Sequence, residues 1–149
     1  MTRLLVLVAD QAHARLYKAE SLRDTFTEVE GFANHVARYH EQQLVSDAPG
    51  RSSSPGNTYS HPLGNEQEAR QHNLALFAKT ISGEIGRALY NQTGTKLYLI
   101  APPKFLGVLR NNLSNEVRHC VAGELNKSIT DVSPEKLAAY IKDIGKVLN

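Results

Sequence analysis

The chain has 149 residues, of which 41% are hydrophobic and 21% charged, and its net charge at pH 7 is +2. This length and mixture predict one globular domain over residues 1–149, large enough to bury a core without disulfides. The single cysteine, Cys120, excludes an internal disulfide and a cysteine-based zinc site. No apolar run approaches the roughly 20 residues of a membrane span, and the short Leu/Val run near the N-terminus is typical of a strand rather than a signal peptide. We therefore expect a cytoplasmic protein with no membrane partner.

The first part of the chain predicts three strands. Leu4–Val8 is a continuous apolar run, which is typical of a strand buried on both faces of a sheet. After a turn at Asp10–Ala12, the segments Ala14–Ala19 and Thr25–Phe32 predict two further strands. Together the three segments predict an antiparallel meander.

A long polar connection follows the meander, from about residue 34 to residue 64. Residues 46–64, SDAPGRSSSPGNTYSHPLG, are nearly devoid of large apolar side chains and cannot build a core of their own. A connection of this length inside a compact domain is usually functional or disordered. We predict a flexible polar loop between the third strand and the first helix.

The longest periodic segment predicts a helix over Glu66–Asn91. Asn65 is its expected N-cap, and Glu68 completes a capping box. Gly83 and Gly86 are unfavourable inside a helix, and we interpret them as allowing close approach to the sheet or as marking a bend.

The remaining segments alternate between strand and helix. Lys96–Ala101 predicts a buried strand, and Pro102-Pro103 opens a short helix. Val117–Leu125 is interpreted as a fifth strand, and Ser133-Pro134 begins the last helix. The predicted fold class is therefore α/β, a five-stranded mixed sheet of β-β-β-α-β-α-β-α order. That is the order of the ribonuclease H-like topology and of its relatives.

Three stretches carry a resemblance to a known family. The opening LLVLVADQAHARLYKAE, the segment APPKFLGVLRNNL and the tail VAGELNKSITDVSPEKLAAYI resemble the bacterial host attachment protein family. The most specific part is Ala101-Pro102-Pro103 with Leu106-Gly107-x-Leu109-Arg110, and the resemblance covers nearly the whole chain.

That family is in turn similar to the central domain of archaeal and eukaryotic class-1 peptide release factors and of pelota. In those release factors a loop between the meander and a long helix carries Gly-Gly-Gln, which promotes peptidyl-tRNA hydrolysis. The loop here has the same place in the element order, but it has no Gly-Gly-Gln. The glycines and the glutamine in Gly50-Arg51 and Gly64-Asn65-Glu66-Gln67 are not adjacent to one another. A water-positioning glutamine needs flanking glycines so that the backbone can approach the substrate. The resemblance therefore implies a ribosome or structured RNA partner and the release-factor binding geometry, without the hydrolase activity.

The loop and the start of the long helix hold most of the predicted binding residues. Arginine presents a fork of donors that matches phosphate oxygens, and the serine hydroxyls and a histidine add further polar contacts. The candidates are Arg51, Ser52, Ser53, His61, Asn65 and Gln67. The alternative is a solvated loop without a partner.

Basic residues on the predicted helices form a second candidate set. They are Arg70, Lys79, Arg87, Lys104 and Arg110. If they line one side of the helical layer, they form a modest basic face suited to RNA phosphates. The alternative is ordinary solvated charge on amphipathic helices.

Asp10, at the end of the first strand, raises a different hypothesis. In ribonuclease H-like nucleases an acidic residue at this place helps to hold a divalent metal, which needs two or three converging carboxylates. Glu28 or Glu30 and Glu124 are the residues that could join it. The simpler interpretation is that Asp10 caps the hairpin turn. The histidines have no metal-ligand spacing, and we expect no cofactor.

Three functions thus remain open from the sequence. The first is a non-enzymatic binding domain that contacts RNA or the ribosome through the loop at 46–64. The second is a metal-dependent nuclease or phosphoesterase using Asp10, and the third is a protein-interaction module whose loop orders on a partner.

Overall fold

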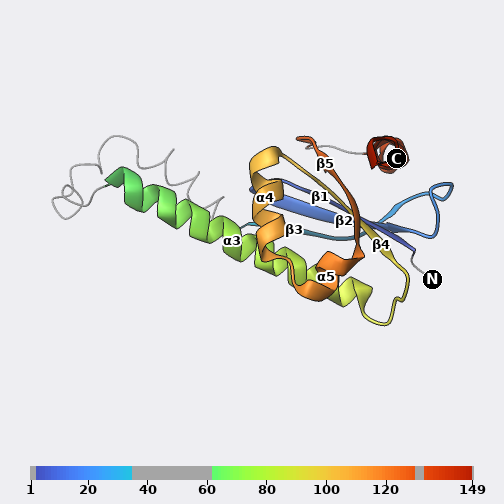
Figure 1. Ribbon diagram of the computed structural model, residues 1–149, viewed down its shortest axis with the longest axis horizontal. Coiled ribbons are helices and arrows are strands. Elements are labelled where there is room, and N and C mark those ends of the chain that lie inside the picture. Colours follow the sequence, from blue (N-terminus) through green and yellow to red (C-terminus); the bar gives the residue numbers. More distant parts are fainter. Residues whose placement is uncertain (1–2, 35–61, 130–132, 149) are drawn as a thin grey trace.

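The computed structural model describes residues 3–34, 62–129 and 133–148, with side chains throughout except at 62–65 and 145–148. Five strands and four helices form this part of the chain (Figure 1). In chain order they are β1 (Leu4–Ala9), β2 (His13–Ala19), β3 (Thr27–Ala33), α3 (Pro62–Leu89), β4 (Lys96–Ala101), α4 (Pro103–Asn112), α5 (Asn115–Cys120), β5 (Val121–Asn126) and α6 (Pro134–Leu148). The predicted α/β class with a five-stranded mixed sheet is confirmed, whereas the ribonuclease H-like topology stays a prediction.

The sheet has the strand order β3-β2-β1-β4-β5. Strands β1, β2 and β3 pair antiparallel, which confirms the predicted meander, and β1, β4 and β5 pair parallel. All six residues of the central strand β1 are buried. The unbroken apolar run in the sequence follows from this position, because both faces of β1 are covered.

One face of the sheet is covered by α3, α4 and α5 (Figure 1). Leu5, Leu7 and Ala9 of β1 belong to the core on this side. Phe105 of α4 stacks on Phe77 of α3 with ring centroids 5.8 Å apart, and Phe77 meets Phe32 of β3 edge-on at 6.3 Å. This aromatic trio joins two helices to the edge of the sheet.

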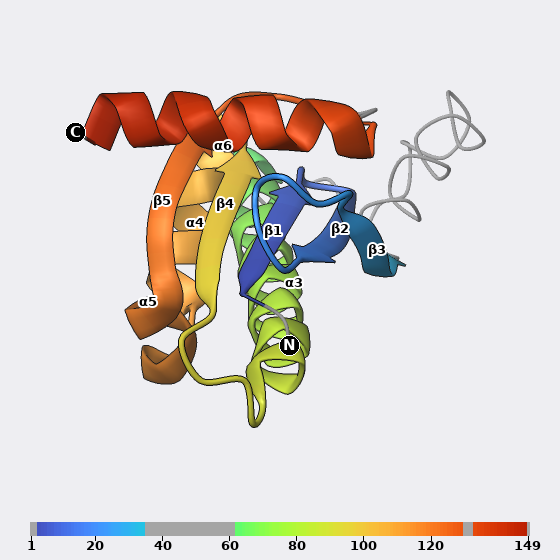
Figure 2. The same cartoon turned by 90° about the vertical axis from the view of Figure 1, so that its right-hand side faces the viewer.

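The opposite face is covered by α6 and by the connection between β2 and β3 (Figure 2). The alternate residues of β1, Leu4, Val6 and Val8, pack in this second core. Leu137 of α6 and Phe26 of the connection are buried there. Helices on one face and a helix plus a loop on the other fix the sheet between two layers.

Helix α3 begins at Pro62, earlier than predicted. Proline is favoured in the first turn of a helix, so the helix extends through residues that the polar composition assigned to the loop. Asn65 therefore lies inside the helix and is not its N-cap. Residues 46–61 of the predicted loop lie outside the described part of the chain.

The glycines of α3 do not bring it closer to the sheet. Gly83 is exposed, and a Cβ atom added there would meet nothing within 4 Å. At Gly86 the nearest atom would be Val117 Cγ2 at 3.9 Å, which is an ordinary contact. The interpretation of Gly83 as a position of close approach is wrong.

The segment before β5 also differs from its prediction. Residues up to Cys120 form helix α5, and the strand begins only at Val121. Ser114 is the N-cap of this helix, because its side chain accepts the N–H of Val117 at 3.3 Å. The backbone N–H of Ser114 donates to Ser82 Oγ at 2.9 Å, which ties the cap to α3. The residues whose alternation predicted a strand, from Val117 onward, thus begin in a short capped helix in which Val117 is buried.

Candidate functional site

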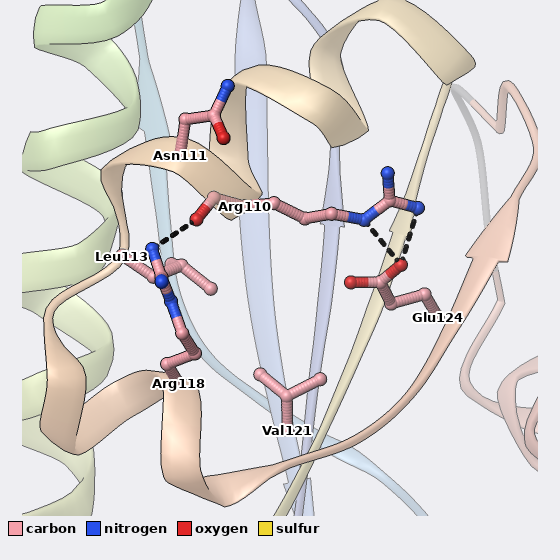
Figure 3. A pocket seen from close by; sticks show the side chains of 6 residues that line it. All are labelled: Arg110, Asn111, Leu113, Arg118, Val121 and Glu124. Atoms are coloured by element: carbon pink, nitrogen blue, oxygen red, sulfur yellow. Dashed lines mark hydrogen bonds and ion pairs between the residues drawn. The ribbon is translucent and has the colours of Figure 1, made fainter.

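A surface cavity of about 430 Å³ lies where α4, α5 and β5 meet (Figure 3). Its lining residues are Arg110, Asn111, Leu113, Arg118, Val121 and Glu124. The volume is within the range of small-molecule sites, and such sites combine apolar walls with a few polar groups. The cavity has both, because Leu113 and Val121 lie among charged side chains.

The turn between α4 and α5 brings the two arginines together. Helix α4 ends where the N–H of Leu113 donates to the carbonyl of Leu109 at 3.0 Å, and Ser114 then caps α5. Arg118 Nη2 donates to the backbone carbonyl of Arg110 at 2.6 Å. This hydrogen bond holds the Arg118 side chain against the end of α4 (Figure 3).

Arg110 reaches in the other direction, across the cavity to Glu124 of β5 (Figure 3). Its Nε and Nη2 both donate to Glu124 Oε1, at 2.7 and 2.6 Å. The hydrogen bond to Glu124 and the attraction of that carboxylate raise the pKa of Arg110, so the guanidinium stays charged. The pair faces solvent, with the Arg110 side chain 55% and that of Glu124 26% exposed.

Three guanidinium nitrogens and one carboxylate oxygen at the cavity are available to a ligand. Within the described part of the chain, Arg110 Nη1 and Glu124 Oε2 have no hydrogen-bond partner. Nε and Nη1 of Arg118 likewise contact no described acceptor. Two guanidinium groups and one carboxylate leave one positive charge, so the site is suited to an anionic group such as phosphate.

The structure brings one of the described candidate residues, Arg110, to the cavity. Lys104 is exposed in the first turn of α4, away from the lining. Gln67 and Arg70 are exposed near the start of α3, where the helix extends beyond the sheet (Figure 1). Asn65 lies in α3, with a side chain that is not described. Outside the described residues lie Arg51, Ser52, Ser53 and His61.

The basic side chains of the helical layer are partly neutralised. Arg87 Nη1 lies 3.3 Å from Glu84 Oε1, and Arg110 pairs with Glu124. Lys79 is exposed on α3. The layer therefore carries a broken pattern of positive charge rather than a uniform basic face.

Sequence reasoning missed Arg118 and Asn111. Interpreting 117–125 as a strand separated Arg118 from Arg110, whereas the α5 turn places them side by side. The sequence does contain a signal for helix α5, in its N-cap residue and in the charges of its first and last turns. Ser114 is a favoured N-cap, Glu116 is in the first turn and Arg118 in the last, which is the pattern that complements a helix dipole.

Asp10 closes the hairpin between β1 and β2. Its Oδ1 accepts the backbone N–H groups of Ala12 at 2.8 Å and of His13 at 2.7 Å. The three carboxylates proposed to join it are engaged elsewhere. Glu28 pairs with Arg15 at 3.9 Å, Glu30 interacts with Glu84, and Glu124 pairs with Arg110. Among residues 3–34, 62–129 and 133–148, no group of three or more His, Cys, Asp or Glu side chains could hold a metal ion. The turn-capping interpretation accounts for Asp10.

These features define a small mixed α/β domain with an arginine-lined cavity at one end of its helical layer. Residues 5–141 match the family described as "Protein required for attachment to host cells", and the chain belongs to this family. The resemblance to host attachment proteins is thus confirmed, while the similarity to release factors stays a prediction. No curated protein matches the chain. None of the described helices is long and apolar enough to cross a membrane.

Proposed function

We propose that the chain is a non-enzymatic cytoplasmic domain that binds structured RNA, with the ribosome as the expected source of that RNA. The observation that carries the proposal is the pair Arg110 and Arg118, whose guanidinium groups have unused donors at one surface cavity. Arginine binds phosphate oxygens with paired, charge-assisted hydrogen bonds, and RNA offers one phosphate per nucleotide.

The surrounding helices support the same partner. Lys104 is exposed on α4 and Arg70 on α3, and these two helices pack against each other. With Lys79, Arg87, Arg110 and Arg118 included, six exposed cations are distributed over this helical layer, and two of them, Arg87 and Arg110, are paired with glutamates. The similarity to release-factor central domains implied by the sequence favours a ribosomal partner. A contribution from Arg51 and the rest of the 46–64 segment stays part of the proposal.

The charges of the chain also determine how strongly RNA is expected to bind. The chain has a net charge of only +2, and Glu84 and Glu124 neutralise part of the layer. If about four phosphates are contacted, log K falls against log salt with a slope of about −3 to −4, because each contact contributes about −0.7 in single strands and about −0.9 in a duplex. Binding is therefore expected to be clear at low salt and weak at physiological salt.

Binding of a labelled structured RNA and co-sedimentation with ribosomes, from about 50 to about 200 mM salt, test the proposal. Arg118→Ala is expected to weaken binding by roughly tenfold, the loss of one hydrogen-bonded charged contact. Arg23→Ala is the matched control, because Arg23 is an exposed arginine on the connection that covers the opposite face of the sheet. Absence of RNA and ribosome binding at low salt would contradict the proposal, as would an equal loss in the two variants.

A further inference from the structure

We infer that the cavity between α4, α5 and β5 binds a phosphate monoester, the terminal phosphate of a nucleotide or of an RNA strand, and that this group displaces Glu124 from Arg110. A phosphate monoester is thus the class of ligand expected at the cavity described above. An RNA strand is a source of this phosphate only if the proposed function holds. Free nucleotide is the other source, and it presents the same chemistry.

The charge balance of the cavity favours a doubly charged group. Arg110 and Arg118 contribute two positive charges, and Glu124 compensates one of them. A phosphate monoester carries about −1.5 to −2 charge at neutral pH and has three terminal oxygens, whereas a diester of the RNA backbone carries −1. When Glu124 moves away, two guanidinium groups meet a group of nearly equal and opposite charge.

Glu124 occupies the position that the ligand would take. Its Oε1 accepts both Arg110 Nε and Arg110 Nη2, the contact that one phosphate oxygen would make with the same edge of the guanidinium. Because the Arg110 side chain is 55% exposed, this ion pair contributes little and is readily exchanged. Phosphate brings further oxygens for the unused donors of Arg118, which the single carboxylate does not reach.

The rest of the cavity accommodates the organic part of the ligand. A volume of about 430 Å³ is far more than one phosphate group needs, and small-molecule sites cover this size range. Leu113 and Val121 supply an apolar wall, and Asn111 also lines the cavity. Arg118 is already held by its 2.6 Å hydrogen bond to the Arg110 carbonyl, so less side-chain freedom is lost on binding.

Calorimetric titration of the full chain with AMP, adenosine and 3′,5′-cyclic AMP tests the ligand class. AMP has the monoester, cyclic AMP has the same nucleoside with a diester, and adenosine has no phosphate. We expect binding in the order AMP, then cyclic AMP, then adenosine, and loss of AMP binding in Arg118→Ala. Equal affinity for AMP and adenosine would overturn the inference. So would the absence of AMP binding together with equal affinity for RNA with and without a terminal phosphate.

Glu124→Gln tests the displacement. It keeps the size of the side chain and removes the competing charge, so AMP affinity is expected to rise about two- to fivefold, the equivalent of an exposed ion pair. Glu116→Gln is the matched control, because Glu116 is an exposed acid of α5 that does not line the cavity. Unchanged or weaker AMP binding in Glu124→Gln, with a thermal midpoint equal to that of the wild type, would contradict the displacement.

RNA of one sequence with either a 5′-phosphate or a 5′-hydroxyl separates the two sources of phosphate. A preference for the phosphorylated strand that disappears in Arg118→Ala supports an RNA end as ligand. AMP binding without any RNA binding supports a site for free nucleotide and contradicts the proposed function. RNA binding that does not depend on the terminal phosphate, with no AMP binding, supports the proposed function and contradicts the phosphate monoester as the ligand.

Discussion

Truncation of Phe105 to alanine is expected to lower the free energy of unfolding by about 3–5 kcal/mol, the range for buried phenylalanine. The Phe105 side chain is fully buried between α4 and the sheet, and its ring stacks on Phe77 at 5.8 Å. Of the total, about 0.5–1.5 kcal/mol comes from the aromatic pair beyond area burial. The remainder comes from lost burial and from the space left behind, because α3 and α4 are both anchored to the sheet and cannot collapse freely.

Urea unfolding followed by circular dichroism measures this loss. The midpoint should fall at an unchanged slope, because the substitution changes stability and not the surface exposed on unfolding. Tyr90→Ala is the matched control, since this aromatic side chain is 75% exposed and its removal should change stability by less than about 0.5 kcal/mol. A Phe105→Ala loss below about 1 kcal/mol, or one equal to that of Tyr90→Ala, would refute the described packing of α4 on α3.

Other substitutions test single features of the fold. Gly83→Ala should stabilise the protein by up to about 1 kcal/mol in thermal or chemical unfolding, because the added methyl meets nothing and glycine is unfavourable in a helix; destabilisation would indicate a contact that is absent from the described residues. Asp10→Asn keeps an oxygen that accepts the turn N–H groups and should retain stability and RNA binding, whereas Asp10→Ala should cost about 1 kcal/mol; selective loss of a nuclease activity in Asp10→Asn would revive the metal hypothesis. The hydrogen bond to Glu84 raises the pKa of Glu30 above its ordinary value of 4.5, so the folded state binds this proton more tightly, and stability should fall as pH rises from 4.5 through the raised pKa. Urea unfolding at a series of pH values across this window should show that the stability of Glu30→Gln falls less with rising pH than that of the wild type. An unchanged pH profile would contradict the hydrogen bond between Glu30 and Glu84.

Most of the sheet was predictable because its sequence pattern is local. The apolar run of β1 and the segment Lys96–Ala101 each predict a buried strand without knowledge of their neighbours, and the observed β4 has those bounds. Pro103 and Pro134 mark the helices that they begin. The start of α3 was missed because Pro62 follows a polar stretch whose composition outweighed the single helix-start signal.

The α5 helix and the cavity depend on contacts that the local pattern does not contain. A run in which Val117, His119 and Val121 alternate fits a strand as well as a short helix, and the hydrogen bond from Ser114 to Ser82 of α3 favours the helix. Arg110 was predicted as a phosphate contact, but its position opposite Glu124 depends on how α4 packs beside β5. Arg118 could be recognised as its neighbour only after the turn between the two helices was known.

Arginine side-chain NMR tests most directly whether this cavity binds phosphate. Titration with AMP and with 5′-phosphorylated RNA is expected to shift the Nε–Hε resonances of Arg110 and Arg118 together, with one saturation curve for each ligand. The resonance of Arg23 on the opposite face should stay in place. Unmoved Arg110 and Arg118 resonances at ligand saturation, or equal shifts at Arg23, would contradict a phosphate site between α4, α5 and β5.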